Sequence, residues 1–169
     1  MVTSQAGIDF IKKNEGFRAT AYNDSAGNAT IGYGTLLHHG PVTELDAQLK
    51  ITEEKAAERL TEHLTNIVEP AINRTVKAPL RQNEFDAIAD WVYNLGTAYL
   101  KEEDCTWLRE LNSGHYGQAS IALLMWNKAM KNGILTVEEG LTRRRVAEAH
   151  LFNKAEVQDG SIPGNTRDA

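Results

Sequence analysis

The feature that most constrains this fold is a long run of apolar residues at helical spacing. From Thr52 to Ala71 they recur every three or four positions, which predicts an amphipathic helix with Thr52 as its N-cap. Pro70 is expected to kink or split this helix, because proline lacks the amide hydrogen that the preceding turn needs. The residues expected on its buried side are Ala56, Leu60, Leu64, Ile67, Val68 and Ala71.

The same spacing predicts further helices over most of the remaining chain. One begins after Pro79 and ends at Gly96, and its inward residues are Phe85, Ile88, Ala89, Val92 and Leu95. Others are expected over Thr106–Leu111, Gln118–Met130 and Val137–Phe152. The segment from Gln158 onward, which contains two glycines and a proline, is expected to form a loose polar tail.

The N-terminal residues predict one more helix. Ile8 and Ile11 lie three apart and Glu15 follows four residues later, so a helix would place all three on one face. Such a helix would begin near Ser4 and end at Gly16, because glycine commonly follows a helix C-terminus. Glu15 is therefore expected at the end of an apolar helical face.

A glycine-rich segment follows this helix and is not helical in pattern. Between positions 19 and 33, short β-favouring pieces flank residues 25–28, which predicts a hairpin of two small strands. The sequence therefore predicts an α+β fold, mainly α, in a single domain over residues 1–169. A small β-containing lobe is expected over about 16–60 and a helical lobe over about 70–155, with the tail at 158–169.

Composition narrows the range of functions. Cys105 is the only cysteine, so no intrachain disulfide forms, and burial in the core is its expected place. The net charge of −5 argues against nucleic-acid binding, which needs clustered Lys and Arg. No apolar stretch is long enough to span a membrane, and the N-terminus lacks a signal-peptide pattern. We therefore expect a protein made in a cytoplasm, without stable membrane insertion.

The sequence does not contain a recognisable metal or cofactor motif. His38 and His39 are adjacent, so their rings diverge, and no His-Glu-x-x-His spacing accompanies them. Residues 23–28 faintly resemble a calcium loop, but Gly34 occupies the place of the required glutamate. No glycine-rich phosphate loop is present. We therefore expect neither a metal nor a cofactor.

Two N-terminal carboxyl groups are expected in different surroundings. Burial at the end of an apolar helix would raise the pKa of Glu15, while solvent and hydrogen-bond donors in the hairpin would keep Asp24 ionised. Glycoside hydrolysis needs such a pair, one carboxyl to donate a proton and one to handle water. The Thr30 hydroxyl, near Asp24 across the hairpin, is suited to hold that water.

Spacing alone is weak evidence for this chemistry. An acidic residue at a helix end and an aspartate in a turn are common surface features of proteins without catalytic function. The spacing of Glu15, Asp24 and Thr30 is expected by accident in roughly a few per cent of chains of this length. The residues between and beyond these three positions must therefore decide the interpretation.

Those residues resemble the phage lysozyme family. Glu15-Gly16, then Ala-Tyr-Asn-Asp at 21–24 and Ala-Thr-Ile-Gly-Tyr-Gly at 29–34, are similar to its catalytic segment in residue type and spacing. Similar blocks follow at 93–96, 107–114, 126 and 140–148. The resemblance covers about residues 4–153 and implies a lysozyme-like fold.

The resemblance implies a muramidase. Glu15 would be the general acid, Asp24 the carboxylate that activates water, and Thr30 the hydroxyl that positions it. The substrate would be bacterial peptidoglycan, hydrolysed without a cofactor at the β-1,4 bond between N-acetylmuramic acid and N-acetylglucosamine. The family also implies inversion at the anomeric carbon.

The substrate groove is less well defined by the sequence. By resemblance, Leu36, Tyr93 and Thr106 would line the cleft, and core packing is an equal alternative for Tyr93. The side chains at 143–145 are all arginines, which suit the peptide carboxylates of the wall. A solvated helix end is the expected place of at least two of them.

The resemblance also implies a setting for the enzyme. A monomeric endolysin would be made in the host cytoplasm, act on the wall in the periplasm and depend on a holin-type protein to open the membrane. The acidic net charge is unfavourable for capture by an anionic wall. Two rival functions remain open: a lytic transglycosylase, which generally manages with one acidic residue, and an inactive peptidoglycan-binding module on the same fold.

Overall fold

The computed structural model describes residues 1–24, 26–131 and 133–155. Its α-helices are α1 (Gln5–Glu15), α2 (Glu53–His63), α3 (Glu69–Thr75), α4 (Gln82–Leu95), α5 (Thr106–Asn112), α6 (Tyr116–Leu123) and α7 (Glu139–Phe152). Shorter helical turns are η1 (Asp46–Gln48), η2 (Leu64–Val68) and η3 (Thr97–Tyr99). The strands are β1 (Arg18–Asn23), β2 (Ala29–Gly32), β3 (Thr35–His38), β4 (Lys128–Lys131) and β5 (Ile134–Val137). This is the mainly helical α+β fold expected from the sequence.

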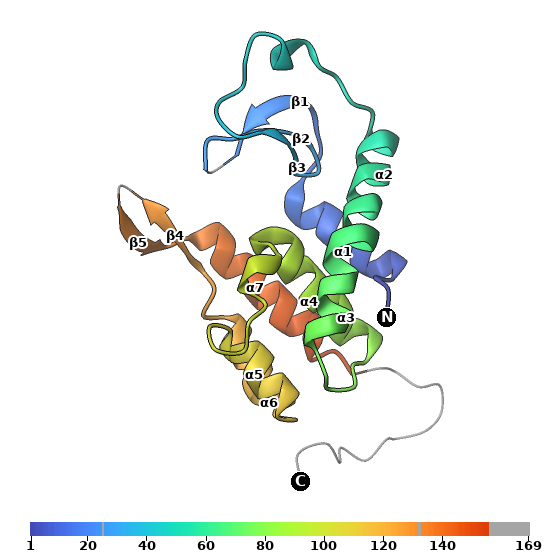
Figure 1. Cartoon of the computed structure of the whole chain (residues 1–169), viewed down its shortest axis with the longest axis vertical. Helices are drawn as coiled ribbons and strands as arrows, with labels where there is room; N and C mark the ends of the chain where they lie inside the picture. Colours follow the sequence, from blue (N-terminus) through green and yellow to red (C-terminus); the bar gives the residue numbers. More distant parts are fainter. Residues whose placement is uncertain (25, 132, 156–169) are drawn as a thin grey trace.

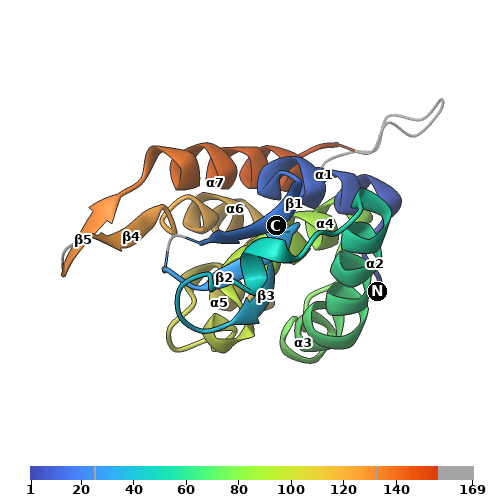
Figure 2. The same cartoon turned by 90° about the horizontal axis from the view of Figure 1, so that it is seen from above.

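The small sheet and the helical body lie at opposite ends of the molecule (Figure 1). Strands β1, β2 and β3 form an antiparallel sheet in that order, and α2 runs from the sheet towards the body. Strands β4 and β5 form a separate antiparallel hairpin that projects from the body (Figure 2). Helix α1 lies between the sheet and the body, so its C-terminal end is close to both.

Helix α1 has the predicted ends. The Ser4 side chain accepts a hydrogen bond from the Gly7 amide at 3.1 Å, which caps the N-terminus. At the other end Gly16 has a φ of 69°, a left-handed conformation that favours glycine and ends the helix. The Ser4 amide also donates to Asp86 of α4 at 2.9 Å, so the helix is fixed to the body.

The predicted long helix after Thr52 is interrupted by a π-helical turn just before Pro70. Thr52 caps α2, as expected, and α2 continues through the π-helical turn η2 into α3, with Pro70 in the first turn of α3. Because the wider turn changes the angle between successive side chains, the helical period shifts there. The prediction that Ile67 is buried is wrong for this reason, since 49% of it is exposed.

The core lies among the helices of the body. Trp91 is fully buried, and its ring meets those of Trp107 and Trp126 edge-on, with centroids 5.1 and 5.0 Å away. Cys105 is buried beside them, as expected. The predicted inward residues Phe85, Ile88, Ala89 and Val92 of α4 are also fully or almost fully buried.

The prediction of a helix over Gln118–Met130 is wrong in its second half. Helix α6 ends at Leu123, and β4 and β5 follow, whose facing residues run from Lys128 opposite Val137 to Lys131 opposite Ile134. The reason is a turn at Gly133, which has a φ of 79° and allows the chain to reverse. The predicted tail at 158–169 lies outside the described residues. No helix among those described has the length and apolar character to cross a membrane.

Candidate active site

Glu15, the last residue of α1, lies at the meeting point of the sheet, α4 and α7. Its Oε1 contacts Nη2 of Arg144 at 2.7 Å, and only 16% of its side chain is exposed. On the sheet side, Gly34 approaches so closely that a Cβ atom there would lie 3.2 Å from Glu15 Oε2. A hydrogen bond of 2.6 Å from the Tyr93 hydroxyl to the Tyr33 carbonyl joins α4 to the same loop.

Burial raises the pKa of Glu15 above its ordinary value, because desolvation disfavours the charged carboxylate. The Arg144 guanidinium opposes this by attraction and by its hydrogen bond, whereas the negative charge of Asp90 adds to the increase. The net direction is upward, so Glu15 keeps its proton to a higher pH than an exposed glutamate. This is the property that a general acid needs near neutral pH.

One row of side chains crosses the sheet on the face towards Glu15. Tyr22 of β1 and Leu36 of β3 both lie opposite Thr30 of β2, and directly opposed residues point to the same face. Desolvation is the largest cause of the raised pKa of Tyr22. The negative charge of Glu15 is the second cause, and the charge of Asp24 also contributes. Tyr22 is therefore close to both carboxyl groups, and the row containing Thr30 faces the site.

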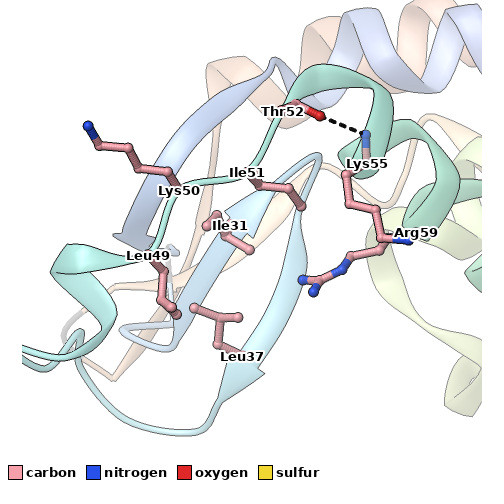
Figure 3. Close-up of a pocket in the computed structure, with 8 residues that line it drawn as sticks. All are labelled: Ile31, Leu37, Leu49, Lys50, Ile51, Thr52, Lys55 and Arg59. Carbon is pink, nitrogen blue, oxygen red and sulfur yellow. Dashed lines mark hydrogen bonds between the residues drawn. The ribbon is translucent and has the colours of Figure 1, made fainter.

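The other face of the sheet carries a separate hollow of about 290 Å³ (Figure 3). Ile31, the neighbour of Thr30, lines it together with Leu37 and Ile51. Because successive side chains of a strand point to opposite faces, this hollow lies behind the sheet as seen from Thr30. It is not part of the site around Glu15.

Asp24 is held by the backbone of the hairpin. Its Oδ1 accepts hydrogen bonds from the amides of Ala26 and Asn28 at 2.9 and 2.8 Å, and Oδ2 accepts one from the Asn28 side chain at 3.4 Å. The Asp24 side chain is half-buried, so its position is fixed while water still has access.

The Thr30 hydroxyl donates to the Asn28 carbonyl at 3.2 Å, and the residue is 3% exposed. Since a hydroxyl has one donor and two acceptor positions, this bond leaves its lone pairs available to a water. Asn28 therefore connects the two residues: its backbone amide donates to Asp24 and its carbonyl accepts from Thr30.

The three predicted groove residues occupy different surroundings. Leu36 is 47% exposed on the row that faces Glu15, so its side chain is accessible from solvent. Tyr93 is half-buried, and its ring lies edge-on to His63 at 5.4 Å, so it packs in the structure as well as bordering the site. Thr106 begins α5 in the helical body, and no contact described for residues 1–24, 26–131 and 133–155 joins it to Glu15.

The expectation that at least two of the three arginines of α7 lie at a solvated helix end is wrong. Arg143 is exposed, but the side chains of Arg144 and Arg145 are only 9% and 0% exposed. Arg144 binds Asp90 of α4 with two N–H groups, each at 2.9 Å, in addition to Glu15. Burial is possible because carboxylates on two other helices pair with it, an arrangement that local sequence does not specify.

Several residues around Glu15 were not identified from the sequence. The Asn14 amide donates to Asp90 at 3.1 Å, and Glu148 lies 2.8 Å from Arg145. A signal existed for Asp90: with Asp86 it interrupts the inward side of an otherwise apolar helix, and a charged residue there requires a partner.

A groove of about 1020 Å³ runs beside the site. Its lining includes Asn14 of α1, Arg144 of α7, Ala26 of the β1–β2 hairpin and Met130 of β4. The neighbour of Glu15 and the arginine that holds it therefore border a space large enough for an extended ligand.

Of the two adjacent histidines, His38 has a structural partner. His38 Nε2 is bonded to Asp46 at 2.8 Å, and Asp46 also accepts bonds from Thr43. These contacts raise the pKa of His38 and lower that of Asp46 to about 2. Throughout the described ranges, no three His, Cys, Asp or Glu side chains are grouped in a way that would hold a metal ion.

Comparisons with known proteins point to one family. The family model for phage lysozyme matches residues 12–148. The endolysin of Salmonella phage P22 is 40% identical over 154 residues, which is 90% of this chain and 98% of that protein. The endolysin of Acyrthosiphon pisum secondary endosymbiont phage 1 is 38% identical over 156 residues, 92% of this chain and 100% of that protein. A solved structure, the endolysin from Escherichia coli O157:H7 phage FAHEc1, has a TM-score of 0.79 and 37% identity, covering 90% of this chain and 94% of that one.

Proposed function

The chain belongs to the phage lysozyme family, and from that membership we propose that it is an endolysin that hydrolyses peptidoglycan. The bond broken is the β-1,4 link between N-acetylmuramic acid and N-acetylglucosamine. The observation that carries the proposal is the buried Glu15 carboxyl, whose pKa is raised, beside the sheet face that presents Thr30.

Glu15 acts as the general acid. Its proton passes to the glycosidic oxygen while the bond from that oxygen to the anomeric carbon breaks, and the Glu15 carboxylate that remains is paired with Arg144 at 2.7 Å. General acid catalysis of this kind contributes about 10²- to 10⁴-fold to the rate. The arginine is already in place, so no rearrangement is needed to stabilise the new charge.

Asp24 and Thr30 act on the water. The carboxylate of Asp24 accepts a proton from the attacking water, whose oxygen forms the new bond to the anomeric carbon, and the Thr30 hydroxyl orients that water. Attack comes from the face opposite the leaving group, which inverts the configuration. After reaction Asp24 holds a proton and Glu15 does not, and exchange with solvent restores both.

The role of Glu15 is tested by the loss of turbidity of chloroform-treated Gram-negative cells. Glu15→Gln is expected to reduce the rate at least about a hundredfold, because the amide cannot donate a proton. Glu62→Gln, on the exposed side of α2, is the matched control and is expected to retain the wild-type rate. A fully active Glu15→Gln variant would refute the assignment, whereas a wild-type chain that clears no cells would favour a binding module instead.

The stereochemistry has its own test. Inversion requires the two carboxyl groups to be about 6.5–9.5 Å apart, whereas a retaining enzyme needs them about 5–5.5 Å apart. Proton NMR of the first product formed from a defined oligosaccharide distinguishes the two anomers. We expect the inverted anomer, and the retained one would require a covalent intermediate.

We further propose that the enzyme acts as a monomer, is made in the host cytoplasm and reaches the wall once a holin-type protein has opened the membrane. Expression of the chain alone in a Gram-negative host is then expected to leave the culture intact until the inner membrane is permeabilised with chloroform. Lysis without permeabilisation would contradict this dependence. Size-exclusion chromatography with light scattering tests the monomer.

A further inference from the structure

Behind Glu15 lies a group of buried charges that the proposed reaction does not use. This buried charge cluster consists of Asp90 of α4 with Arg144, Arg145 and Glu148 of α7. Asp90, Arg145 and Glu148 have no exposed side-chain surface, and Arg144 is 9% exposed. Arg144 links the cluster to the site, because it binds Asp90 through Nε and Nη2 and contacts Glu15 through Nη2.

The charges in this region do not balance when every carboxyl is ionised. Two guanidinium groups face three carboxyl groups, those of Glu15, Asp90 and Glu148. Two uncharged amides also contact these groups: Asn14 donates to Asp90 at 3.1 Å, and Asn94 accepts from Arg145 at 2.7 Å. Because an unbalanced buried charge is costly, either Asp90 or Glu148 is expected to hold a proton once Glu15 has given up its own.

Geometry distinguishes the carboxyl groups. Asp90 accepts two N–H groups of Arg144 and one of Asn14, which suits a carboxylate. Glu148 meets the arginines at Nη2 of Arg145, 2.8 Å away, and at Nε of Arg144, 3.7 Å away. Neither of its oxygens accepts a well-aligned hydrogen bond from any residue that the structure describes.

We propose that Glu148 carries a proton in the working enzyme and is therefore uncharged. The two arginines then exceed Asp90 by one positive charge, and that excess balances Glu15 once it has given up its proton. Glu148 is thus a positioning residue that acts through the two arginines. This proposal rests on the proposed role of Glu15 as the general acid.

The pKa values agree with this distribution. Burial raises the pKa of Glu148 well above its ordinary value; the positive charge of Arg145 opposes this increase, and the neighbouring Asp90 adds to it. The groups that act on Glu15 are Arg144, Asp90 and Arg145, while Tyr22 and Tyr93 nearby have raised pKa values and stay neutral.

Infrared spectroscopy of the purified full chain tests the proposal without any activity assay. The Glu15→Gln variant at about pH 8 is expected to retain a C=O band of a protonated carboxylic acid, since exposed carboxyl groups are ionised there. The same band is expected to disappear in the double variant with Glu148→Gln. Absence of the band from Glu15→Gln, or its persistence in the double variant, would overturn the proposal.

The pH dependence of kcat/KM supplies the second readout. If Glu148 is neutral, Glu148→Gln keeps the alkaline limit of the profile at the wild-type pH, whereas Asp90→Asn moves that limit lower by about one pH unit or more. A similar downward shift in Glu148→Gln would mean that Glu148 is ionised in the native enzyme and would overturn the proposal. If Glu15 were not the general acid, Asp90→Asn would not move the alkaline limit of the pH profile, while the infrared band would still disappear with Glu148→Gln.

Discussion

Gly34 gives a sharp test of how the sheet positions Glu15. Its φ of 84° lies in the left-handed region, and a Cβ atom would lie 3.2 Å from Glu15 Oε2 and 3.9 Å from the Tyr93 ring. The first distance is shorter than ordinary van der Waals contact, so the carboxyl group must move by a few tenths of an ångström. Gly34→Ala therefore combines backbone strain with displacement of the Glu15 carboxyl group.

The two effects have separate magnitudes. A left-handed alanine costs about 1–2 kcal/mol, and the stiffer unfolded chain returns about 0.4–1 kcal/mol, so the expected net loss is about 1 kcal/mol. For a chain of this size that corresponds to a decrease in Tm of about 2–4 °C. Displacement by a fraction of an ångström is expected to lower kcat about tenfold, since a shift of 1 Å costs roughly a hundredfold.

A second glycine separates strain from displacement. Gly114, in the turn before α6, has the same φ of 84°, but a Cβ atom there meets nothing within 4 Å. Gly114→Ala should lose similar stability and keep its activity. Thermal melts by circular dichroism and release of reducing ends from purified peptidoglycan measure the two quantities. Equal loss of activity in both variants would refute the claim that Gly34 positions Glu15.

The other predictions concern the acid, its arginine, the hydroxyl and the histidine pair. Glu15→Gln should be more stable than wild type at about pH 7 but not at about pH 4, and thermal melts at both pH values measure this. The reason is that the pKa of Glu15 is raised in the folded state, so above the unfolded value of 4.5 its ionisation favours unfolding. Arg144→Lys should lower kcat about tenfold with little change in KM, because one ammonium cannot replace two N–H bonds to Asp90 together with the contact to Glu15; steady-state kinetics test this. Thr30→Val should lose at least about tenfold in kcat while Thr30→Ser retains most of it, and an active Val variant would exclude the hydroxyl from the mechanism. His38→Gln should destabilise the protein most between the ordinary pKa of Asp46, 3.8, and that of His38, 6.5. The stabilisation from protonated His38 is lost as pH rises through the raised pKa of His38. The stabilisation from ionised Asp46 is lost as pH falls towards its lowered pKa of about 2. Urea unfolding across this pH range measures both losses.

Local signals in the sequence predicted most of the helices. Ser4 and Gly16 fix the ends of α1, and Thr52 fixes the start of α2, because caps act through neighbouring backbone groups. The burial of Ile67 was predicted wrongly because the π-helical turn before Pro70 shifts the helical period. The β4–β5 hairpin was missed although Asn-Gly at 132–133 between two apolar segments is a strong hairpin signal.

The candidate site was predicted only in part, since part of it depends on tertiary contacts. The positions of Glu15, Asp24 and Thr30 follow from one continuous segment and its resemblance to a family. The burial of Arg144 could not be predicted in that way, because its partners lie on α1 and α4, far away in sequence. An arginine on a helix surface and one buried between two carboxylates look alike until the helices are packed.

The most direct test of hydrolysis by this chain is product analysis in ¹⁸O-labelled water. Purified peptidoglycan digested with the enzyme is separated into its muropeptides, which are weighed by mass spectrometry. Attack by a water held between Asp24 and Thr30 predicts reducing N-acetylmuramic acid ends that carry one ¹⁸O, and no such products from Glu15→Gln. Anhydro ends without the label would show that the sugar's own hydroxyl attacks, and would contradict the hydrolytic mechanism.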